Sequence, residues 1–422
     1  MKQAVSQIFI TKIFDFGLRF AASVLIARYL GPEDKGVLTF ATLVVAWLVT
    51  FGNLSLTDAT VYFVGKRDFL PEQVAGSMFT FSVLAGLVYT GVTVWLLVAG
   101  VVDWPVGDRP VFFVLLSLVP LQLLLGNFTA ILQGLSRFKA FNFFTLLGSG
   151  LFFVSVLAVV LMPENRLLAV AIAMVVAAGL TTVSLAAYLR RVAPWRAQLS
   201  VQFLKRGLSY GARCHLSVIL ETINRRFDQL VLGVLVDPIQ LGWYSIAVTI
   251  SELPQLLPDS IGTVLFPKVA SDHAEGAVVT ARVCRLTVVA ILVIATAMVL
   301  LARPVIRIVY GEAFLPAAEP LLFLIPGILF LSISKILSKY ICGVGRPHFI
   351  MWPTLASAVV TLGLIFPMVR IYGMDGAAIT SSTAYAVAAL VNLLLTVKLS
   401  AKRAMEFVVP QRIDLQTNPF LR

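Results

Sequence analysis

Charged side chains are scarce in this sequence. Asp, Glu, Lys and Arg together make up 13% of the 422 residues, whereas hydrophobic residues make up 59%. A soluble globular domain carries about 25% charged residues. The composition therefore excludes a soluble protein of this size and predicts an all-α polytopic membrane protein.

Residues that serve catalysis or metal binding are also few. The three cysteines and three histidines show no paired or metal-binding spacing, so we expect neither a disulfide framework nor a metal site. A glycine-rich phosphate loop is absent, so we expect no nucleotide cofactor. We therefore predict that the chain is not an enzyme.

Long apolar runs are what the sequence has instead. About 20 apolar residues are enough to cross about 30 Å of hydrocarbon as a helix. We predict twelve transmembrane helices, at about 8–29, 36–64, 73–100, 110–134, 140–162, 167–189, 207–235, 241–269, 279–301, 317–342, 347–369 and 375–398.

The basic residues indicate the orientation of these helices. With the N-terminus in the cytoplasm, 20 of the 33 Lys and Arg residues fall on the cytoplasmic side and 6 on the other side. Cytoplasmic loops of membrane proteins carry such an excess. We therefore expect both termini in the cytoplasm, with the net charge of +12 facing anionic lipids and no role for nucleic acid.

Two loop motifs recur in the second half of the chain. The Pro-x-x-x-Gly motif at 32–36 returns at 238–242, an offset of 206 residues. The Gly-x-x-Arg motif at 134–137 returns at 343–346, an offset of 209. Repeats in the same membrane sense predict two pseudo-symmetric six-helix lobes related by an axis along the membrane normal.

The predicted organisation has four parts. These are an N-terminal lobe at 1–189, a cytoplasmic linker at 190–206, a C-terminal lobe at 207–400 and a cytoplasmic tail at 401–422. Trp195 and Phe203, which lie among the charges of the linker, suggest a short helix in the membrane interface.

Ionisable residues interrupt two of the predicted membrane helices at equivalent places. With the offset of 206 taken from the loop motif, Asp15 falls on Glu221 and Arg19 falls on Arg225. An unpaired charge in the bilayer centre costs at least ~2.5–3.5 kcal/mol, so these residues must pair or face water. Two interpretations stay open: structural ion pairs, or a charged cavity of a two-lobed transporter.

Further charged residues extend this set. Cations beyond the number that pairing requires favour an anionic ligand, because the arginine fork suits phosphate. We count Lys12, Arg213 and Lys335 as such surplus cations. Glu221, Arg225 and Asp228 should share one helix face, whereas Arg226, about 140° from Glu221 at 100° per residue, should point elsewhere. Candidate acids for ion coupling or gating are Asp15, Glu221, Asp58, Asp228 and Glu252.

Several stretches resemble the bacterial polysaccharide-type flippases, the oligosaccharide-lipid branch of the superfamily that also holds multidrug and toxin extrusion transporters. They are ARYLGPEDKG at 27–36, RFDQLVLG at 226–233, LGWYS at 241–245, Pro-Lys at 267–268 and YGMDGAA at 372–378. The pieces are spread over most of the chain.

The resemblance implies a V-shaped exporter fold with alternating access. It implies a function in which an undecaprenyl-pyrophosphate-linked oligosaccharide repeat unit, of O-antigen or exopolysaccharide type, moves to the outer leaflet of the bacterial inner membrane. The cavity cations of the family correspond to Arg19, Arg225 and Lys335. Polysaccharide polymerase or assembly proteins are further candidate partners.

Three alternatives remain at this point. A cation-coupled multidrug or solute exporter would use membrane carboxylates, and Asp15, Asp58, Glu221 and Glu252 are available. A lipid II flippase usually has two more helices than this chain has room for. A membrane enzyme that acts on the same lipid carrier would need a larger outer loop than the longest one here, about 302–317.

Overall fold

Every regular element in the described part of the chain is a helix. The computed structural model describes residues 2–101, 109–161, 165–271, 273–400 and 402–409. Within these residues the chain divides into two compact units, Met1–Ile219 and Leu220–Arg422. The expectation of an all-α protein is confirmed, whereas the lobe boundaries at 189 and 207 stay a prediction.

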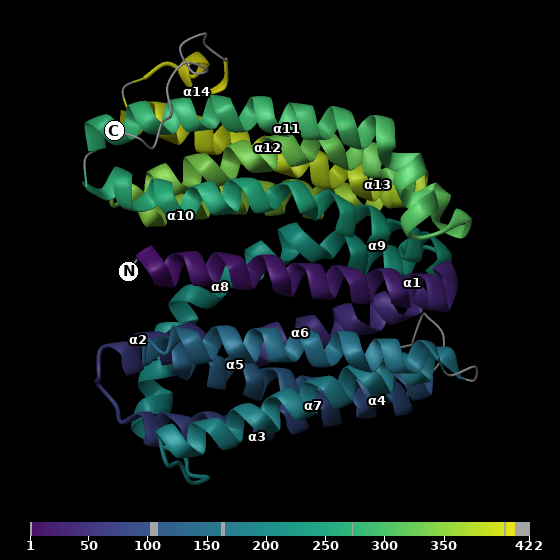
Figure 1. Ribbon diagram of the computed structural model, residues 1–422, viewed down its shortest axis with the longest axis vertical. Helices are drawn as coiled ribbons and strands as arrows, with labels where there is room; N and C mark the ends of the chain where they lie inside the picture. Colours follow the sequence, from purple (N-terminus) through teal and green to yellow (C-terminus); the bar gives the residue numbers. More distant parts are fainter. Residues whose placement is uncertain (1, 102–108, 162–164, 272, 401, 410–422) are drawn as a thin grey trace. The chain divides into compact units, whose positions relative to one another are not determined.

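The first unit holds seven helices and the first half of an eighth. Their bounds are α1 (Lys2–Asn53), α2 (Leu56–Gly65), α3 (Pro71–Val98), α4 (Arg109–Leu116), α5 (Leu118–Gly134), α6 (Phe138–Val160), α7 (Arg166–Val192) and α8 (Val201–Leu235). Helix α6 packs against α1 and α7, and α5 packs against α2 and α3. These contacts make a bundle of apolar helices (Figure 1).

The segment after α7 belongs to the core of the first unit. Trp195 and Phe203 are buried in a cluster with Phe128 and Leu189. Phe203 lies near the start of α8, which continues without a break to Leu235. The expected separate interfacial helix is therefore wrong, because residues 193–200 are not helical and both aromatic residues pack into the core of the bundle.

The second unit contains the rest of α8 and the remaining helices. Their bounds are α9 (Pro238–Glu252), η1 (Leu253–Gln255), α10 (Leu256–Ser271), α11 (His273–Val309), η2 (Glu312–Ala317), α12 (Ala318–Gly343), η3 (Pro347–Ile350), α13 (Met351–Ser400) and α14 (Met405–Val408). Helix α12 packs against α10, α11 and α13, and α14 packs against α11, as the green and yellow part of Figure 1 shows. Residues 401 and 410–422 of the predicted tail lie outside the described residues.

Eight segments of the described chain are long and apolar enough to span a membrane. Two of them bend at a glycine with a non-helical backbone, α1 at Gly31 and α13 at Gly373. Large apolar side chains such as Leu87, Val183 and Leu300 are exposed on the helices. These findings show a multi-pass membrane protein, and the number of twelve crossings stays a prediction.

The recurring Gly-x-x-Arg motif forms the same corner in both units. Helix α5 ends at Gly134 and α12 ends at Gly343. Two residues later, Ser136 and Gly345 adopt the left-handed conformation. The next backbone N–H then donates to the carbonyl five positions earlier, at 2.9 Å in the first unit and 3.2 Å in the second. This is the hydrogen bond of a Schellman helix end.

Candidate functional site

The acidic residue and the arginine of α1 form a close ion pair. Arg19 Nε donates to Asp15 Oδ1 at 2.9 Å, which confirms the pairing that the spacing of four allows. Lys12 is exposed one turn earlier, and the described residues provide no ion-pair partner for it. This part of the first unit therefore presents one neutralised arginine and one free lysine.

The equivalent pair of α8 is part of a larger cluster. Arg225 lies 3.8 Å from Glu221 and 3.8 Å from Glu252, the last residue of α9. Arg226 lies 3.2 Å from the same Oε1 atom of Glu252. The expectation that Arg226 points away from the site is wrong, because α9 brings the carboxylate between the two arginines.

Glu252 lies where the helical path changes. Helix α9 ends at this residue, and the 3₁₀ turn of Leu253–Gln255 follows before α10 begins. Pro254 lies in that turn and has no N–H to donate. Gln255 is held by α12, where its Nε2 donates to Ile328 O and Ser332 Oγ, both at 3.2 Å.

Asp228 lies in a different environment from Glu221 and Arg225. Its side chain is buried within the second unit, where it accepts hydrogen bonds from Tyr244 Oη at 2.6 Å and Ser381 Oγ at 2.8 Å. Glu221 and Arg225 have side chains that are 67% and 54% exposed. The expected common face is therefore wrong for Asp228, which turns into the packed interior.

Lys335 forms an ion pair with Asp259 that its own helix does not reveal. Its Nζ atom donates to Asp259 Oδ2 at 3.0 Å, which joins α12 to α10. The expectation of a surplus charge at Lys335 is therefore wrong. Arg213 is exposed on α8 without an ion-pair partner in the described part of the chain, and Asp58 is exposed in the first turn of α2.

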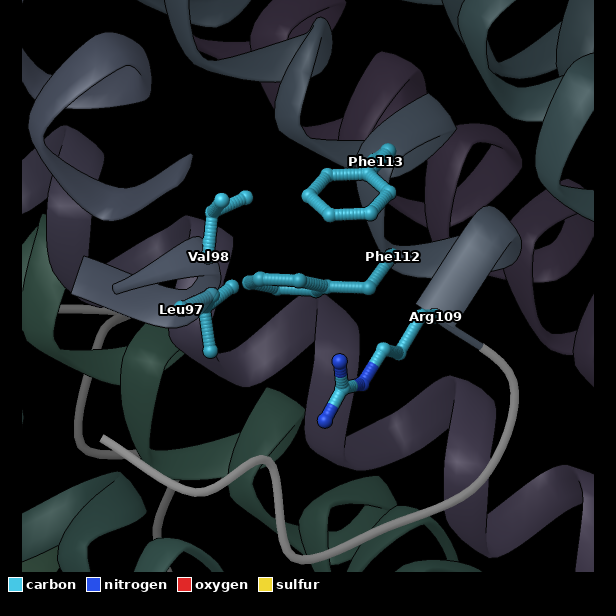
Figure 2. A pocket seen from close by; sticks show the side chains of 5 residues that line it. All are labelled: Leu97, Val98, Arg109, Phe112 and Phe113. Atoms are coloured by element: carbon cyan, nitrogen blue, oxygen red, sulfur yellow. The ribbon is translucent and has the colours of Figure 1, made fainter. Parts of the chain in front are cut away.

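A small pocket lies elsewhere in the first unit. It has a volume of about 200 Å³ and lies between the end of α3 and the start of α4. Figure 2 shows the Phe112 ring pointing toward Leu97 and Val98, with Arg109 beside it. The predicted site residues do not line this pocket. Groups of three or more His, Cys, Asp or Glu side chains able to hold a metal ion do not occur among the residues described.

Comparison with solved structures shows which known fold the chain has. A lipid II flippase, MurJ, in an inward closed conformation matches with a TM-score of 0.78 at 16% identity, over 93% of this chain and 90% of that one. An inward-facing multidrug resistance transporter of the MATE family and the MOP superfamily matches with a TM-score of 0.74 at 17% identity, over 94% and 98% of the two chains. The fold is therefore that of the MOP-superfamily transporters.

The sequence comparison then gives the family. The model of the family described as "Polysaccharide biosynthesis protein" matches residues 25–319, and the chain belongs to this family. A Shigella flexneri protein described as "Putative O-antigen transporter" is 24% identical over 374 residues, which cover 85% of this chain and 88% of the relative. The chain is thus a member of the polysaccharide biosynthesis protein family with the fold that these transporters share.

Proposed function

We propose that the chain is an alternating-access flippase. It moves an undecaprenyl-pyrophosphate-linked oligosaccharide repeat unit from the inner to the outer leaflet of the bacterial inner membrane. The observation that carries the proposal is the pair Arg19 and Arg225, which recur at an offset of 206 in a polysaccharide-family protein, on two helices that we predict to lie in the membrane. A pyrophosphate group needs cations in such surroundings, and the arginine fork offers two-point contacts to its oxygens.

The other cations have supporting roles in this proposal. Lys12 and Arg213 are exposed and have no carboxylate partner in the described part of the chain, so they are available to the anionic headgroup. Lys335 can contribute only by exchanging Asp259 for substrate, because the two residues form an ion pair at 3.0 Å. We therefore place Lys335 behind Arg19 and Arg225 in importance.

Energy for net transport comes, in this proposal, from the membrane potential or from a proton or Na⁺ gradient. The candidate acids are Asp15, Asp58, Glu221, Asp228 and Glu252. Asp228 has support from its geometry, because it is a buried carboxylate surrounded by hydroxyl groups. Intramembrane acids of this kind mark ion pathways in many transporters.

Orientation and partners complete the proposal. Both termini and the 190–206 segment face the cytoplasm and its anionic lipids, and the polysaccharide polymerase or assembly machinery receives the product. Labelling of a single cysteine at position 198, in a cysteine-free background, tests the orientation. Strong labelling there by an impermeant reagent added from outside contradicts it.

Arginine replacement tests the function itself. Arg19→Ala and Arg225→Ala should abolish surface polysaccharide export while the protein stays at normal abundance in the membrane. Arg19→Lys and Arg225→Lys should restore only part of the export, because a point charge lacks the fork. Reconstituted vesicles with labelled lipid-linked oligosaccharide measure leaflet transfer directly, and full activity of the alanine variants would show that the arginines are structural.

A further inference from the structure

Two neighbouring arginines of α8, Arg225 and Arg226, converge on one anionic oxygen. Neighbouring residues in a helix are separated by about 100°, so their side chains normally diverge. Nevertheless, the terminal nitrogens of Arg225 and Arg226 both approach Oε1 of Glu252, at 3.8 Å and 3.2 Å. The two guanidinium groups therefore surround a position that suits an anion.

The anion that now fills this position is weakly held. Charge-assisted hydrogen bonds have lengths of about 2.7–2.9 Å. All the contacts of this cluster are longer, and the Glu252 side chain is 35% exposed. Partly exposed pairs of this kind contribute little to stability. Glu252 can therefore leave the arginines at a small cost in free energy.

The charges of the cluster favour a ligand with more than one negative charge. Arg225 and Arg226 carry two positive charges, and the single carboxylate of Glu252 balances only one of them. Glu221 balances the other from 3.8 Å on the Arg225 side. A diphosphate offers several oxygens and at least two charges, so it can satisfy both arginine forks at once.

Glu252 is also placed where its release can change the structure. It precedes the Pro254 turn at which the chain passes from α9 to α10. Gln255, on the far side of this turn, is tied to α12. A 3₁₀ stretch that interrupts a helical path often marks a functional hinge. The Glu252 contact thus ties the end of α9 to α8 directly before this turn.

We propose that Arg225 and Arg226 form a binding site for a diphosphate ester, and that Glu252 is a built-in counter-ion that occupies the site until the ligand displaces it. The inference rests on the proposed function for the source of the ligand, a lipid-linked diphosphate. It adds Arg226 to the substrate-binding residues and gives Glu252 the role of a competitor. Displacement of Glu252 also frees the α9–α10 turn from α8.

Direct binding measurements on the purified full chain in detergent test this inference. The probes are farnesyl diphosphate, farnesyl monophosphate and inorganic pyrophosphate, each titrated by calorimetry. Glu252→Gln keeps the shape of the side chain and removes the competing charge, so farnesyl diphosphate should bind about fivefold tighter. The matched control Glu221→Gln, which removes a carboxylate that contacts Arg225 alone, should tighten binding less, by about twofold.

Arg226 provides the opposite test. Arg226→Gln should weaken farnesyl diphosphate binding about tenfold, and Arg226→Lys should weaken it less. The monophosphate should be much less sensitive to either change. Thermal unfolding of each variant checks that it folds. Glu252→Asp is a second variant at the counter-ion position: its shorter side chain reaches the arginines less well, so farnesyl diphosphate binding should also tighten.

The outcomes separate the inference from the proposed function. Unchanged or weaker diphosphate binding in the Glu252→Gln and Glu252→Asp proteins would overturn the role of Glu252 as a competitor. Unchanged binding in Arg226→Gln would remove Arg226 from the site. Equal affinity for inorganic pyrophosphate and farnesyl diphosphate would keep the two-arginine site but assign it to a soluble anion, which contradicts the proposed flippase function instead.

Discussion

The two units of the chain share their corners but differ in their chemistry. Both units end one helix at a glycine of the Gly-x-x-Arg motif and turn through a left-handed residue. Both start a helical stretch at the proline of the Pro-x-x-x-Gly motif, Pro32 after the bend at Gly31 and Pro238 at the start of α9. Turn geometry requires these residues, so they recur whatever the neighbouring side chains do.

The charged helices show the difference. In α1 the acid and the arginine form an isolated pair at 2.9 Å. In α8 the equivalent arginine shares Glu252 with Arg226. At the offset of 206, Phe20 and Ala46 stand where Arg226 and Glu252 stand in the second unit. The second unit therefore has two arginines around one carboxylate, an arrangement that is absent from the described residues of the first unit at the equivalent positions.

A second difference lies in the packed interior. Asp228 corresponds to Ala22 at the same offset, and both positions are buried. The first unit fills the position with a methyl group, whereas the second unit places a carboxylate there with Tyr244 and Ser381 as donors. The comparison shows that the same buried position of a helix bundle can hold either an apolar side chain or a hydrogen-bonded polar one.

The largest expected loss of stability comes from Asp228→Ala, which gives the second unit the alanine that the first unit has at the equivalent position. Asp228→Ala leaves the hydroxyl groups of Tyr244 and Ser381 without their acceptor, and each such buried group costs about 1–3 kcal/mol. We expect a lower free energy of unfolding in detergent by at least about 2 kcal/mol. Asp228→Asn, which retains an acceptor oxygen, is the matched control and should lose less. Equal stability of the Ala variant and the wild type would show that this network is dispensable.

Added methyl groups at the two corner glycines should give the next largest effect. A Cβ on Gly134 would lie 2.7 Å from Val64 Cβ, and a Cβ on Gly343 would lie 2.6 Å from Val269 Cγ1. Such overpacking typically costs about 1–3 kcal/mol, so Gly134→Ala and Gly343→Ala should lower the melting temperature by similar amounts.

The corner glycines also have a control and a rescue. Gly126 lies in α5 and has open space around its missing Cβ, so Gly126→Ala should be neutral or stabilising. Val64→Ala should restore the Gly134→Ala protein, and Val269→Ala should restore the Gly343→Ala protein. A loss confined to one unit would show that the two corners are not mechanically equivalent.

The fold was more predictable from the sequence than the site. Apolar runs and repeated turn motifs depend on local chemistry, and the helices broadly follow the predicted ranges. Helices α1 and α13 each cover more than one range, and the ranges 36–64, 110–134 and 241–269 are each divided between two helices. The pairing of Asp15 with Arg19 was also predictable, because a spacing of four places both residues on one helix face.

The side-chain partners that come from other helices could not be predicted from the sequence. Arg226, Lys335 and Asp228 were each placed by reference to their own helix, but their partners lie on α9, α10 and, for Asp228, on both α9 and α13. A helical angle cannot show which neighbour supplies a carboxylate or a hydroxyl group. The acids Asp259 and Glu252 are the signal that could have suggested such partners, since buried charges in membrane proteins rarely stay alone.

The paired acids should affect coupling more than stability. Asp15→Asn and Glu221→Gln remove exposed ion pairs, each of which is worth about 0–1 kcal/mol. The unfolding midpoint should change little in both variants. If these acids couple transport to an ion gradient, both variants should still bind the lipid-linked sugar in proteoliposomes but lose the part of transport that an imposed pH or Na⁺ gradient drives. A wild-type response in both variants would exclude them as coupling groups.

The smallest expected effect concerns a change of local mobility with pH in two segments, which we call the closing segments. They are residues 193–200 after α7 in the first unit and residues 402–409 after α13 in the second unit. In the first unit, the segment after α7 is held by the contact of Arg190 with the Trp195 ring and by the hydrogen bond from Ser200 N–H to Ser77 Oγ at 2.9 Å. These contacts contain no carboxylate. In the second unit, the segment after α13 buries Phe407 in the core. Glu406 directly precedes Phe407 in the chain.

The contacts of the Glu406 side chain predict that the second closing segment is sensitive to pH. The Arg403 backbone N–H and the Lys402 ammonium both donate to its carboxylate, at 2.9 Å and 3.1 Å, and they lower the pKa of Glu406 below its ordinary value. A carboxyl group whose folded-state pKa is lowered stabilises the folded conformation of this segment above its unfolded pKa, about 4.3. This contribution is lost as the pH falls through the folded-state pKa.

We therefore expect the second segment, and not the first, to loosen in mild acid. A fluorophore on Met405→Cys, in a cysteine-free background, should show a falling anisotropy below about pH 4, the ordinary range of a glutamate. The same fluorophore on Gln198→Cys should show no such step, because hydrogen bonds and an aromatic contact hold that segment. Glu406→Gln should remove the step at position 405. Matching pH profiles at positions 405 and 198 would show that the closing segments of the two units are held by the same forces.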